Sequence, residues 1–442
     1  MSKKSVLILA FMLFLLWAIS SGKFEATIQC GLAADGTQRI RHIPSDFTSI
    51  QAAIDNASSG DTIVVAPGTY SETLSISKSL TIIGEDRDTT IVDGQGVGDA
   101  ISIRSDSVTI TGLTVMSNGT GIRRNAIAVD HHGGIIVDAT KLAGSYYALS
   151  LAFCSNSIFS NNVIINNTFG IELINTNNNV FSNNTISGNG EGIAFDYINN
   201  LNVFFGNTFL DNIEGAAIRQ SSYENSFYHN NFLDQITIET GGTNFWNRSD
   251  EGNYWSSYKG QDFYSGQYQN ETGSDGIGDE PYTLGENNYD EYPLMGVFSE
   301  FNVSLPYDET ENVAIISNST VSNLNLLTWL SSPHNGLQPG QSFIQFTATG
   351  ENGTVGFCRL MIPRTALNGS SYIVLFDDQP ISATELPFSN SSHVYLYFTY
   401  THSTHEVIVT IPEYAAFLIP PIFMIATLLA IIVYKRKHLT RA

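Results

Sequence analysis

The sequence reads IFSNNVI at 158–164, VFSNNTI at 180–186, VFFGNTF at 203–209 and SFYHNNF at 226–232. One asparagine of each stretch, at 162, 184, 207 and 230, recurs at intervals of 22, 23 and 23 residues. A glycine at 170, 192 and 215 follows the same intervals. A repeat of this length indicates a solenoid, because each unit must bury its hydrophobic face against the next one.

The hydrophobic runs inside each repeat are too short for helices, and they consist of β-branched and aromatic residues that favour strands. The regular leucines of a leucine-rich repeat are absent. We therefore predict a parallel β-helix with coils about 4.8 Å apart, with room for about eight coils between Thr62 and Phe245. Asparagine suits the corners because it tolerates left-handed backbone angles, and stacked asparagine side chains can form ladders.

A short helix is expected before the first coil. Phe47, Ile50 and Ile54 recur at helical spacing, and Ser45 or Asp46 can cap the N-terminus of this helix. Such a helix would cover the open end of the solenoid.

The charge balance argues against nucleic acid as a partner. The chain carries 42 Asp and Glu against 20 Lys and Arg, whereas binding to phosphates needs clustered basic residues. With 42% hydrophobic and 14% charged residues, the chain is too apolar to be disordered. The three widely spaced cysteines form no disulfide framework, so a hydrophobic core must hold the fold together.

Residues 1–23 have the form of a secretory signal peptide. Lys3 and Lys4 precede the hydrophobic run Val6–Ile19, and small residues follow it. An uncleaved N-terminal anchor is the alternative.

Residues 415–434 are predicted to form one transmembrane helix, because 20 uncharged residues match the thickness of a bilayer. The basic tail 435–442 is expected to stay in the cytoplasm, so the protein would sit in the cell membrane with residues 24–413 outside. Its partners would then include membrane lipid through this helix. Eleven Asn-x-Ser/Thr sites are glycosylation candidates, at Asn56, Asn118, Asn166, Asn183, Asn247, Asn270, Asn302, Asn318, Asn352, Asn368 and Asn390.

Residues 40–296 resemble the NosD-type β-helix domains, a family named for a periplasmic copper-binding protein. The resemblance is carried by Ile50–Ile54 (IQAAI), Gly60–Tyr70 (GDTIVVAPGTY), Gly252–Ser256 (GNYWS), Asp275–Tyr282 (DGIGDEPY) and Asp290–Leu294 (DEYPL). It implies a right-handed parallel β-helix of the carbohydrate-binding and sugar-hydrolysis group, and the family name implies copper. With its C-terminal anchor, the chain resembles archaeal cell-surface versions of this family.

Residues 297–411 are predicted to form a separate, membrane-proximal β-sandwich, because the asparagine period stops and longer strands follow. Ser342–Thr349 and Thr354–Ile362 flank the turn sequence Gly350–Gly353, which predicts a hairpin. The complete prediction is an all-β protein: a β-helix with a capping helix, then this sandwich and one transmembrane helix.

Three residues of the acidic loop near the end of the β-helix are candidate calcium ligands. Asp275, Asp279 and the carbonyl of Ile277 place oxygen atoms on alternate residues, as Ca²⁺ sites do. The EF-hand spacing is absent, and a turn with solvated carboxylates is the alternative.

The same region is rich in aromatic residues. Trp255, Tyr258 and Tyr264 are candidates for a surface that stacks against sugars. The alternative is that these rings cover the open edge of the last coil.

A copper site, as the family name implies, has His131 and His132 as its best candidates. Adjacent residues of a strand point to opposite faces, which argues against joint chelation by this pair.

Enzymatic activity is not predicted, although stacked coils could gather carboxylates. The candidates for such a cluster are Asp130, Asp138, Glu172, Asp196 and Arg219. The sequence lacks the acid motifs that mark polygalacturonase-like enzymes and mannuronan epimerases. We therefore expect non-catalytic binding or display of glycans at the cell envelope. A lyase or hydrolase acting on acidic sugars is one alternative, and a copper-binding protein is the other.

Overall fold

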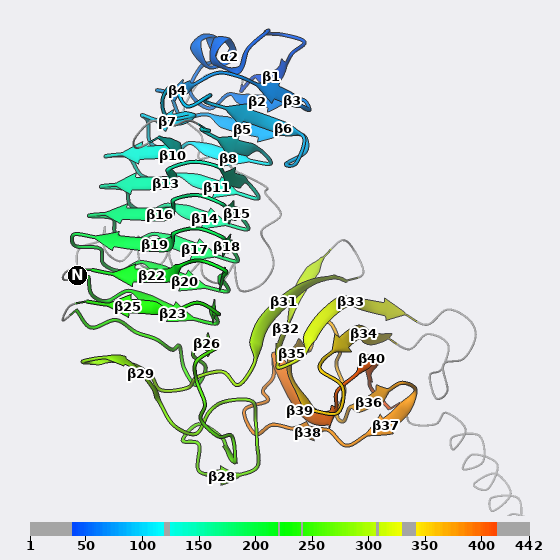
Figure 1. Cartoon of the computed structure of the whole chain (residues 1–442). Helices are drawn as coiled ribbons and strands as arrows, with labels where there is room; N and C mark the ends of the chain where they lie inside the picture. Colours follow the sequence, from blue (N-terminus) through cyan, green and yellow to red (C-terminus); the bar gives the residue numbers. More distant parts are fainter. Residues whose placement is uncertain are drawn as a thin grey trace, which may run out of the picture. The chain divides into compact units, whose positions relative to one another are not determined.

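Short strands stack into three parallel sheets, which form the sides of a right-handed β-helix of about nine turns (Figure 1). The computed structural model describes residues 38–118, 124–219, 222–239, 242–305, 309–328 and 342–412. Sheet A consists of β1 (Ile40–Ile43), β2 (Thr62–Val65), β5 (Thr81–Gly84), β8 (Thr109–Thr111), β11 (Ile136–Asp138), β14 (Ile158–Ser160), β17 (Val180–Ser182), β20 (Val203–Phe205) and β23 (Ser226–Tyr228).

The other two sheets follow the same order along the axis. Sheet B consists of β3 (Gly68–Tyr70), β6 (Thr90–Asp93), β9 (Thr114–Met116), β12 (Lys141–Ala143), β15 (Val163–Ile165), β18 (Thr185–Ser187), β21 (Thr208–Leu210), β24 (Asn231–Phe232) and β26 (Tyr254–Trp255). Sheet C consists of β4 (Leu74–Ile76), β7 (Ile101–Ile103), β10 (Asn125–Asp130), β13 (Tyr147–Ala152), β16 (Phe169–Ile174), β19 (Glu191–Asp196), β22 (Glu214–Ile218) and β25 (Ile236–Ile238).

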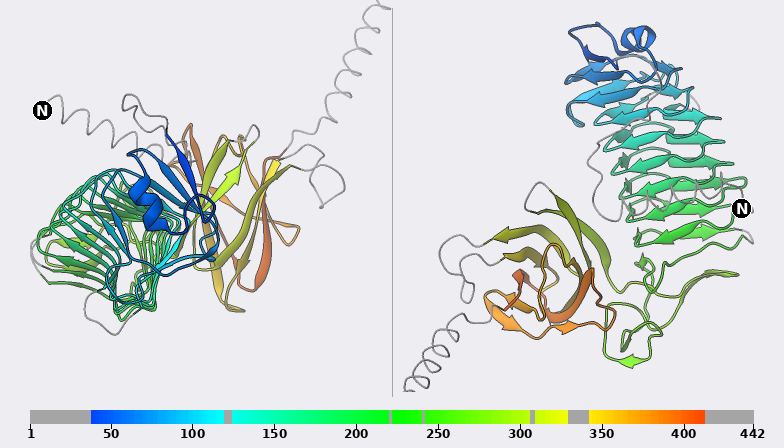
Figure 2. Two further views of the ribbon diagram at one scale, coloured as in Figure 1. Left: turned by 90° about the horizontal axis from the view of Figure 1, so that it is seen from above. Right: turned by 180° about the vertical axis from the view of Figure 1, so that it is seen from behind.

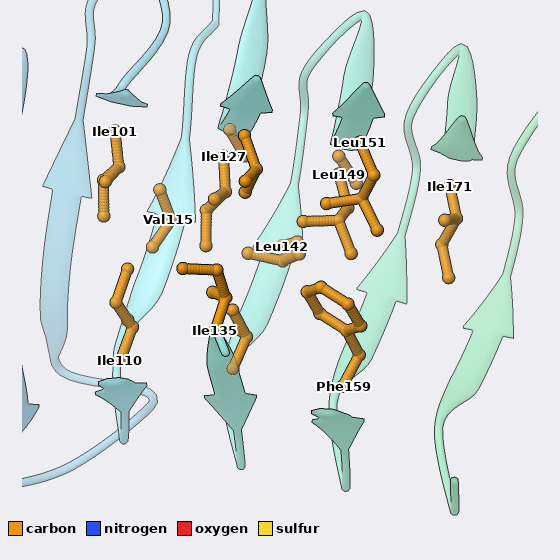
Figure 3. Close-up of a cluster of buried hydrophobic side chains, with 14 of the residues drawn as sticks. Ile101, Ile110, Val115, Ile127, Ile135, Leu142, Leu149, Leu151, Phe159 and Ile171 are labelled. Carbon is orange, nitrogen blue, oxygen red and sulfur yellow. The ribbon is translucent and has the colours of Figure 1, made fainter. Parts of the chain in front are cut away.

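The repeat in the sequence corresponds to one coil. In sheet A, Ile158 pairs with Val180 and Phe159 with Phe181, so equivalent residues of neighbouring repeats lie side by side. Alternate residues of each strand point inward, and their side chains fill the space between the three sheets (Figure 3). This core is continuous from coil to coil, which is why no single repeat could be stable alone.

Aromatic rings also stack along the core. Phe159, Phe181, Phe204 and Phe227 form a continuous column with ring centroids 5.0, 4.6 and 4.8 Å apart, and Trp246 continues it at 4.4 Å. The spacing matches the separation of adjacent parallel strands, about 4.8 Å.

The repeated asparagines form buried ladders, as predicted. The Nδ2 of Asn162 donates to the Oδ1 of Asn184 at 3.0 Å, and Asn184 donates in the same way to Asn207 at 2.8 Å. Each Oδ1 also accepts the main-chain N–H of the asparagine one coil earlier, as Asn184 does from Asn162 at 3.0 Å. The ladder therefore satisfies main-chain and side-chain groups that would otherwise be buried without partners.

The left-handed corners fall one residue earlier than these ladders. Asn161 and Asn183, the first asparagines of their repeats, have φ values of 56° and 54°. Gly206 and His229 take the same place in the next two repeats, with φ values of 66° and 56°. The two adjacent asparagines of the motif thus have different functions, one in the corner and one in the ladder.

The repeated glycine allows adjacent coils to approach closely. A Cβ atom on Gly170 would lie 2.4 Å from the carbonyl oxygen of Gly192, and one on Gly192 would lie 2.3 Å from that of Gly215. Any larger residue here would push the stacked strands apart.

The predicted capping helix exists, but it begins later than expected. Helix α2 (Ile50–Asn56) lies across the end of the first coil (Figure 2). Its N-cap is Ser49, whose side chain accepts the N–H of Ala52 at 3.2 Å, and not Ser45 or Asp46. The preceding residues form β1 and a turn, in which Asp46 accepts the N–H of His42 at 2.7 Å.

The chain divides into two compact units, and the boundary lies within β31 (Val297–Ser304). After the last coil come two short hairpins, one of β27 (Tyr264–Ser265) with β28 (Glu271–Thr272) and one of β29 (Tyr282–Gly285) with β30 (Asn288–Asp290). Two five-stranded sheets follow, and most of their residues belong to the second unit; Val297–Glu300 of β31 and Ala314–Ser317 of the strand after it are grouped with the first. One consists of β31, β32 (Thr310–Ser317), β35 (Val355–Pro363), β39 (His393–Thr401) and β38 (Thr384–Glu385). The other consists of β33 (Thr320–Thr328), β34 (Ser342–Thr349), β40 (Thr404–Thr410), β36 (Ile373–Phe376) and β37 (Gln379–Ile381).

The hairpin predicted around Gly350–Gly353 is wrong. Its two strands, β34 and β35, belong to different sheets: β34 pairs with β33 and β40, and β35 pairs with β39. A turn sequence between two hydrophobic runs does not distinguish a hairpin from a connection that crosses between sheets, because both reverse the chain.

The predicted signal peptide at 1–23, transmembrane helix at 415–434 and cytoplasmic tail at 435–442 lie outside the described residues. Within the part of the chain that is described, no helix has the length and hydrophobicity needed to cross a bilayer.

Candidate functional site

Stacking brings two of the proposed catalytic residues together. Arg219 follows β22 and reaches back along the axis, with its Nη1 3.6 Å from Oδ1 of Asp196. Its Nη2 donates to Oε1 of Glu191 at 2.8 Å, and its Nε lies 4.0 Å from Oε1 of Glu239. Arg219 and Asp196 are one repeat apart in the sequence, so the period itself predicts this contact. The hydrogen bond that Arg219 donates to Glu191 and the three negative charges raise the pKa of Arg219.

Glu191 and Glu239 were not predicted from the sequence. Glu191 lies at the other end of β19, and the coil that ends at Glu239 is shorter than the regular repeat, so neither shares the simple period of Arg219. We call these four residues the Arg219 cluster.

The other catalytic candidates lie apart from one another. Asp138 is in sheet A and accepts hydrogen bonds from Ser160 at 2.7 Å and Asn161 at 2.8 Å. Glu172 is in sheet C and accepts from the hydroxyl of Ser150 at 2.7 Å. Asp138 and Glu172 are therefore hydrogen-bonded to residues of neighbouring coils, and they lie in different sheets.

One guanidinium group is shared by the three carboxylates of the Arg219 cluster, at N–O distances of 2.8, 3.6 and 4.0 Å. Burial raises the pKa of two other carboxyl groups, those of Asp262 and Asp290, to about 7, and both lie in the segment after the regular coils.

A column of exposed rings runs beside the cluster. His131, Phe153, Asn175 and Tyr197 directly follow β10, β13, β16 and β19, where sheet C ends and the chain turns toward sheet A (Figure 1). The side chain of His131 is 65% exposed, and Phe153 and Tyr197 are 48% and 55% exposed. We call His131, Phe153 and Tyr197 the aromatic corner.

The backbone of this corner is left-handed at every position. The φ values are 60° at His131, 50° at Phe153, 49° at Asn175 and 61° at Tyr197. For residues other than glycine and asparagine, this conformation costs about 1–2 kcal/mol. Asn175 suits it, whereas Phe153 and Tyr197 do not, and their exposed rings gain little burial in return. An exposed aromatic ring on a strained backbone indicates that the ring has a function in binding and not in packing.

Further hydrophobic side chains extend the exposed surface at this corner. Ile198 and Leu201 are each 48% exposed and Tyr223 is 42% exposed. One clue to this corner could be found in the sequence, because Leu201 stands where the preceding coils place Asn178, Asn156 and Gly134.

Trp255, Tyr258 and Tyr264 do not form one sugar-stacking surface. Trp255 is buried and stacks between Phe232 at 4.4 Å and Tyr282 at 4.9 Å, so its faces are covered. Tyr258 is half-buried and its hydroxyl donates to the carbonyl of Glu280, 2.6 Å away.

Tyr264 differs from these two residues. It is 45% exposed and lies in β27, in the hairpin that follows the last coil. The physical reason for the difference is that the open end of the last coil must be covered by apolar groups, and Trp255 is the ring that continues the core.

The carboxylates of the acidic loop accept N–H groups. Asp275 accepts the main-chain N–H of Ile277 at 3.1 Å, and Asp279 accepts those of Phe263 at 2.8 Å and Tyr264 at 3.1 Å. Within the described ranges, no group of three or more His, Cys, Asp or Glu residues is arranged to hold a metal ion.

Asp262 is a further member of this loop that the sequence did not reveal. It accepts the main-chain N–H groups of Asp275 at 3.0 Å and Gly276 at 2.8 Å. Burial, followed by the charges of Asp275 and Asp279, raises its pKa to about 7.

His131 and His132 bind different carboxylates. The Nδ1 of His131 is 2.6 Å from Oδ1 of Asp130, and its ring stacks on Phe153 with centroids 4.3 Å apart. The Nδ1 of His132 is 3.2 Å from Oδ1 of Asp106, whose pKa is lowered mainly by the N–H of Gly133.

The glycosylation candidates lie at the surface. Asn247 is half-buried, and the other ten asparagines are exposed.

Residues 54–260 match the sequence profile of a family described as periplasmic copper-binding protein (NosD). This match confirms the resemblance that the motifs predicted, over just under half of the chain. A comparison with curated protein sequences gives no match.

Several solved structures are similar to the β-helix. A pectin methylesterase from Erwinia chrysanthemi has 14% identity and a TM-score of 0.36, over 48% of this chain and 82% of that one. A pectin methylesterase from Yersinia enterocolitica has 16% identity and a TM-score of 0.33, over 43% and 80%. An alginate lyase from a Paenibacillus species has 15% identity and a TM-score of 0.33, over 49% and 94%. These scores carry no argument about activity.

Proposed function

We propose that this protein binds glycans at the cell surface without catalysis, and that the aromatic corner is its binding surface. The observation that supports this proposal is the exposure of His131, Phe153 and Tyr197, at equivalent positions of three out of four successive coils, in a backbone conformation that disfavours Phe and Tyr. Flat rings with exposed surface stack well against the apolar faces of sugars.

The polar neighbours of the corner complement this surface. Asp130 and Asp196 directly precede His131 and Tyr197, and their carboxylates can accept hydrogen bonds from sugar hydroxyl groups. Arg219 is paired with Glu191 and Asp196, and His131 with Asp130, so these polar side chains surround the exposed rings. Rings flanked by hydrogen-bonding groups support binding and display of a sugar.

The location at the cell surface rests on the predicted signal peptide and membrane helix. A protease added to intact cells should digest the segment 24–412 and leave a membrane-protected C-terminal fragment. Full protection of the protein in intact cells would contradict an outside location.

Glycan binding is tested with the full-length protein in detergent micelles on an array of envelope and plant polysaccharides. The informative variant is Tyr197→Asn, because asparagine suits the left-handed backbone and should leave the melting temperature unchanged or slightly higher. We expect this variant to lose about tenfold in affinity, the value of one aromatic contact.

A matched control is Ile213→Asn. Ile213 is 89% exposed and lies in the turn between sheets B and C, away from the aromatic corner. We expect it to bind as the wild type does. A wild-type protein that binds no glycan would contradict the proposed function.

A further inference from the structure

The aromatic column has one gap, and the gap is at Asn175. The register of sheet C pairs Asp130 with Ala152, Ala152 with Ile174, and Ile174 with Asp196. The residues that follow these four are His131, Phe153, Asn175 and Tyr197, so they occupy the same corner on successive coils. Three of the four carry rings, and the third position carries a short amide.

One face of the Phe153 ring is left uncovered by His131. His131 covers one face, with ring planes 21° apart and centroids 4.3 Å apart. The opposite face is directed along the axis toward the coil of Asn175. Tyr197 lies one coil beyond Asn175, which places it two coils, or about 10 Å, from Phe153.

We infer that the position above Asn175 is a subsite for a single uncharged sugar ring, held between Phe153 and Tyr197. A ring midway between them would be about 5 Å from each, which is the centroid separation of stacked rings. This inference rests on the proposed function and names the subsite and the class of sugar.

The amide of Asn175 supplies a polar contact at the base of the subsite. Among the described residues, the hydrogen bond at Asn175 goes to its main-chain carbonyl, which accepts from Nδ2 of Asn177 at 3.5 Å, and its side chain has no such bond. In contrast, Nδ2 of the ladder residue Asn179 donates to the carbonyls of Cys154 and Asn177 and to Oδ1 of Asn202. The amide of Asn175 can therefore offer one acceptor and two donors to sugar hydroxyl groups.

Charge selects the class of sugar. Asp130 and Asp196 lie on either side of the subsite along the axis, at the same corner of sheet C. The guanidinium group of Arg219 is already shared among Asp196, Glu191 and Glu239. A uronate in the subsite would lie one coil from Asp196 but three coils, about 14 Å, from the exposed Arg104, which follows β7 at the same corner. The nearer like charge therefore repels it. An uncharged hexose or N-acetylhexosamine avoids this repulsion and can still donate its hydroxyl hydrogens to the carboxylates.

The test uses isothermal titration of the full-length protein in detergent with neutral tetrasaccharides of glucose, mannose and N-acetylglucosamine, and with a galacturonate tetrasaccharide. We expect binding of at least one neutral sugar, with an affinity that changes little with salt, and weaker binding of the galacturonate. Tighter binding of the galacturonate would overturn the inference about charge.

The decisive variant is Asn175→Phe, which fills the subsite and completes the ring column. Phe153 occupies the same backbone conformation one coil earlier, so the fold should accept the change. We expect the affinity for the neutral sugar to fall at least about tenfold. The matched control is Asn166→Phe, at an exposed residue with φ of 56° at another corner, which should bind as the wild type does.

A second variant keeps the test valid if Asn175→Phe does not fold. Phe153→Asn removes one side of the subsite with a residue that suits the left-handed backbone, and it should also lower the affinity about tenfold. Wild-type binding by both variants would overturn the subsite and leave the proposed function intact. A wild-type protein that binds none of the sugars, here and on the array, would overturn both.

Discussion

The Oδ2 atom of Asp290 accepts the main-chain N–H of Asn253 at 2.7 Å, and this contact ends the asparagine ladder that begins at Asn162. Each asparagine in the ladder both donates and accepts, so the last one needs a partner that only accepts. A carboxylate meets this need. Asp234 ends a second ladder in the same way, where it accepts the Nδ2 of Asn212 at 2.7 Å.

The buried position of Asp290 makes stability depend on pH. Burial raises its pKa to about 7, although the N–H groups of Trp255 and Asn253 act in the opposite direction. Because this folded pKa is above the unfolded value of about 3.9, the folded protein binds the proton more tightly. The contribution to stability is present below about pH 4 and is lost as the pH rises through about 7.

We therefore expect the free energy of unfolding to fall between about pH 4 and about pH 7, with a contribution on the order of 4 kcal/mol from Asp290. Asp290→Asn should be less stable than wild type at low pH, because its amide N–H groups face N–H donors. The difference in unfolding free energy between wild type and Asp290→Asn should become smaller as the pH rises. Urea unfolding at a series of pH values and constant ionic strength measures this difference. If the unfolding free energies of the two proteins changed in parallel with pH, Asp290 would not be the group responsible.

Removal of a ladder asparagine should be strongly destabilising. Asn184→Ala leaves the N–H and Nδ2 groups of Asn162 and the carbonyl of Phe159 without their partners. Each such buried group costs about 1–3 kcal/mol, so we expect a total loss of at least about 3 kcal/mol in urea unfolding.

The control for this prediction is Thr185→Ala at the next residue, which is exposed in β18. It should change stability by less than about 0.5 kcal/mol. Equal effects of the two substitutions would show that the ladder contributes no more than an ordinary surface side chain.

Calcium at the acidic loop remains a prediction. Burial is the main cause of the raised pKa of Asp262, and the charges of Asp275 and Asp279 add to it, so negative charge is concentrated there. A divalent cation would relieve this repulsion, and we expect millimolar Ca²⁺ to raise the melting temperature of the full-length protein relative to EDTA.

The double variant Asp275→Asn, Asp279→Asn should abolish this difference. Identical melting of the wild type in Ca²⁺ and EDTA would mean that the N–H donors of the loop hold these carboxylates without a cation.

Copper binding by His131 and His132 can also be measured directly. His131 and His132 hydrogen-bond to Asp130 and Asp106, on different coils, so a metal would have to displace both contacts. We expect only weak copper binding that His132→Ala does not change. Tight, stoichiometric binding that is lost in this variant would support the copper function implied by the family name.

The fold followed from the sequence because the repeat is local and periodic. An interval of 22 or 23 residues places Asn162, Asn184 and Asn207 in one column without knowledge of any distant contact, and the structure shows that column. The same periodicity placed Asp196 and Arg219 together. The prediction was wrong where the period stops, at the hairpin around Gly350–Gly353, since sandwich strands pair with partners that are remote in the sequence.

The sequence by itself determined the β-helix and its columns of asparagine and glycine, because these residues repeat at intervals of 22 or 23. The tertiary structure supplied Asp290, 37 residues after Asn253, as the acceptor that ends one ladder. Only the tertiary structure decided which rings are open to solvent. Trp255 and Tyr197 are both aromatic residues at or near a coil edge, yet Trp255 is 3% exposed and Tyr197 is 55% exposed. The difference arises because Trp255 covers the end of a hydrophobic core, whereas the left-handed backbone at Tyr197 turns its ring away from that core.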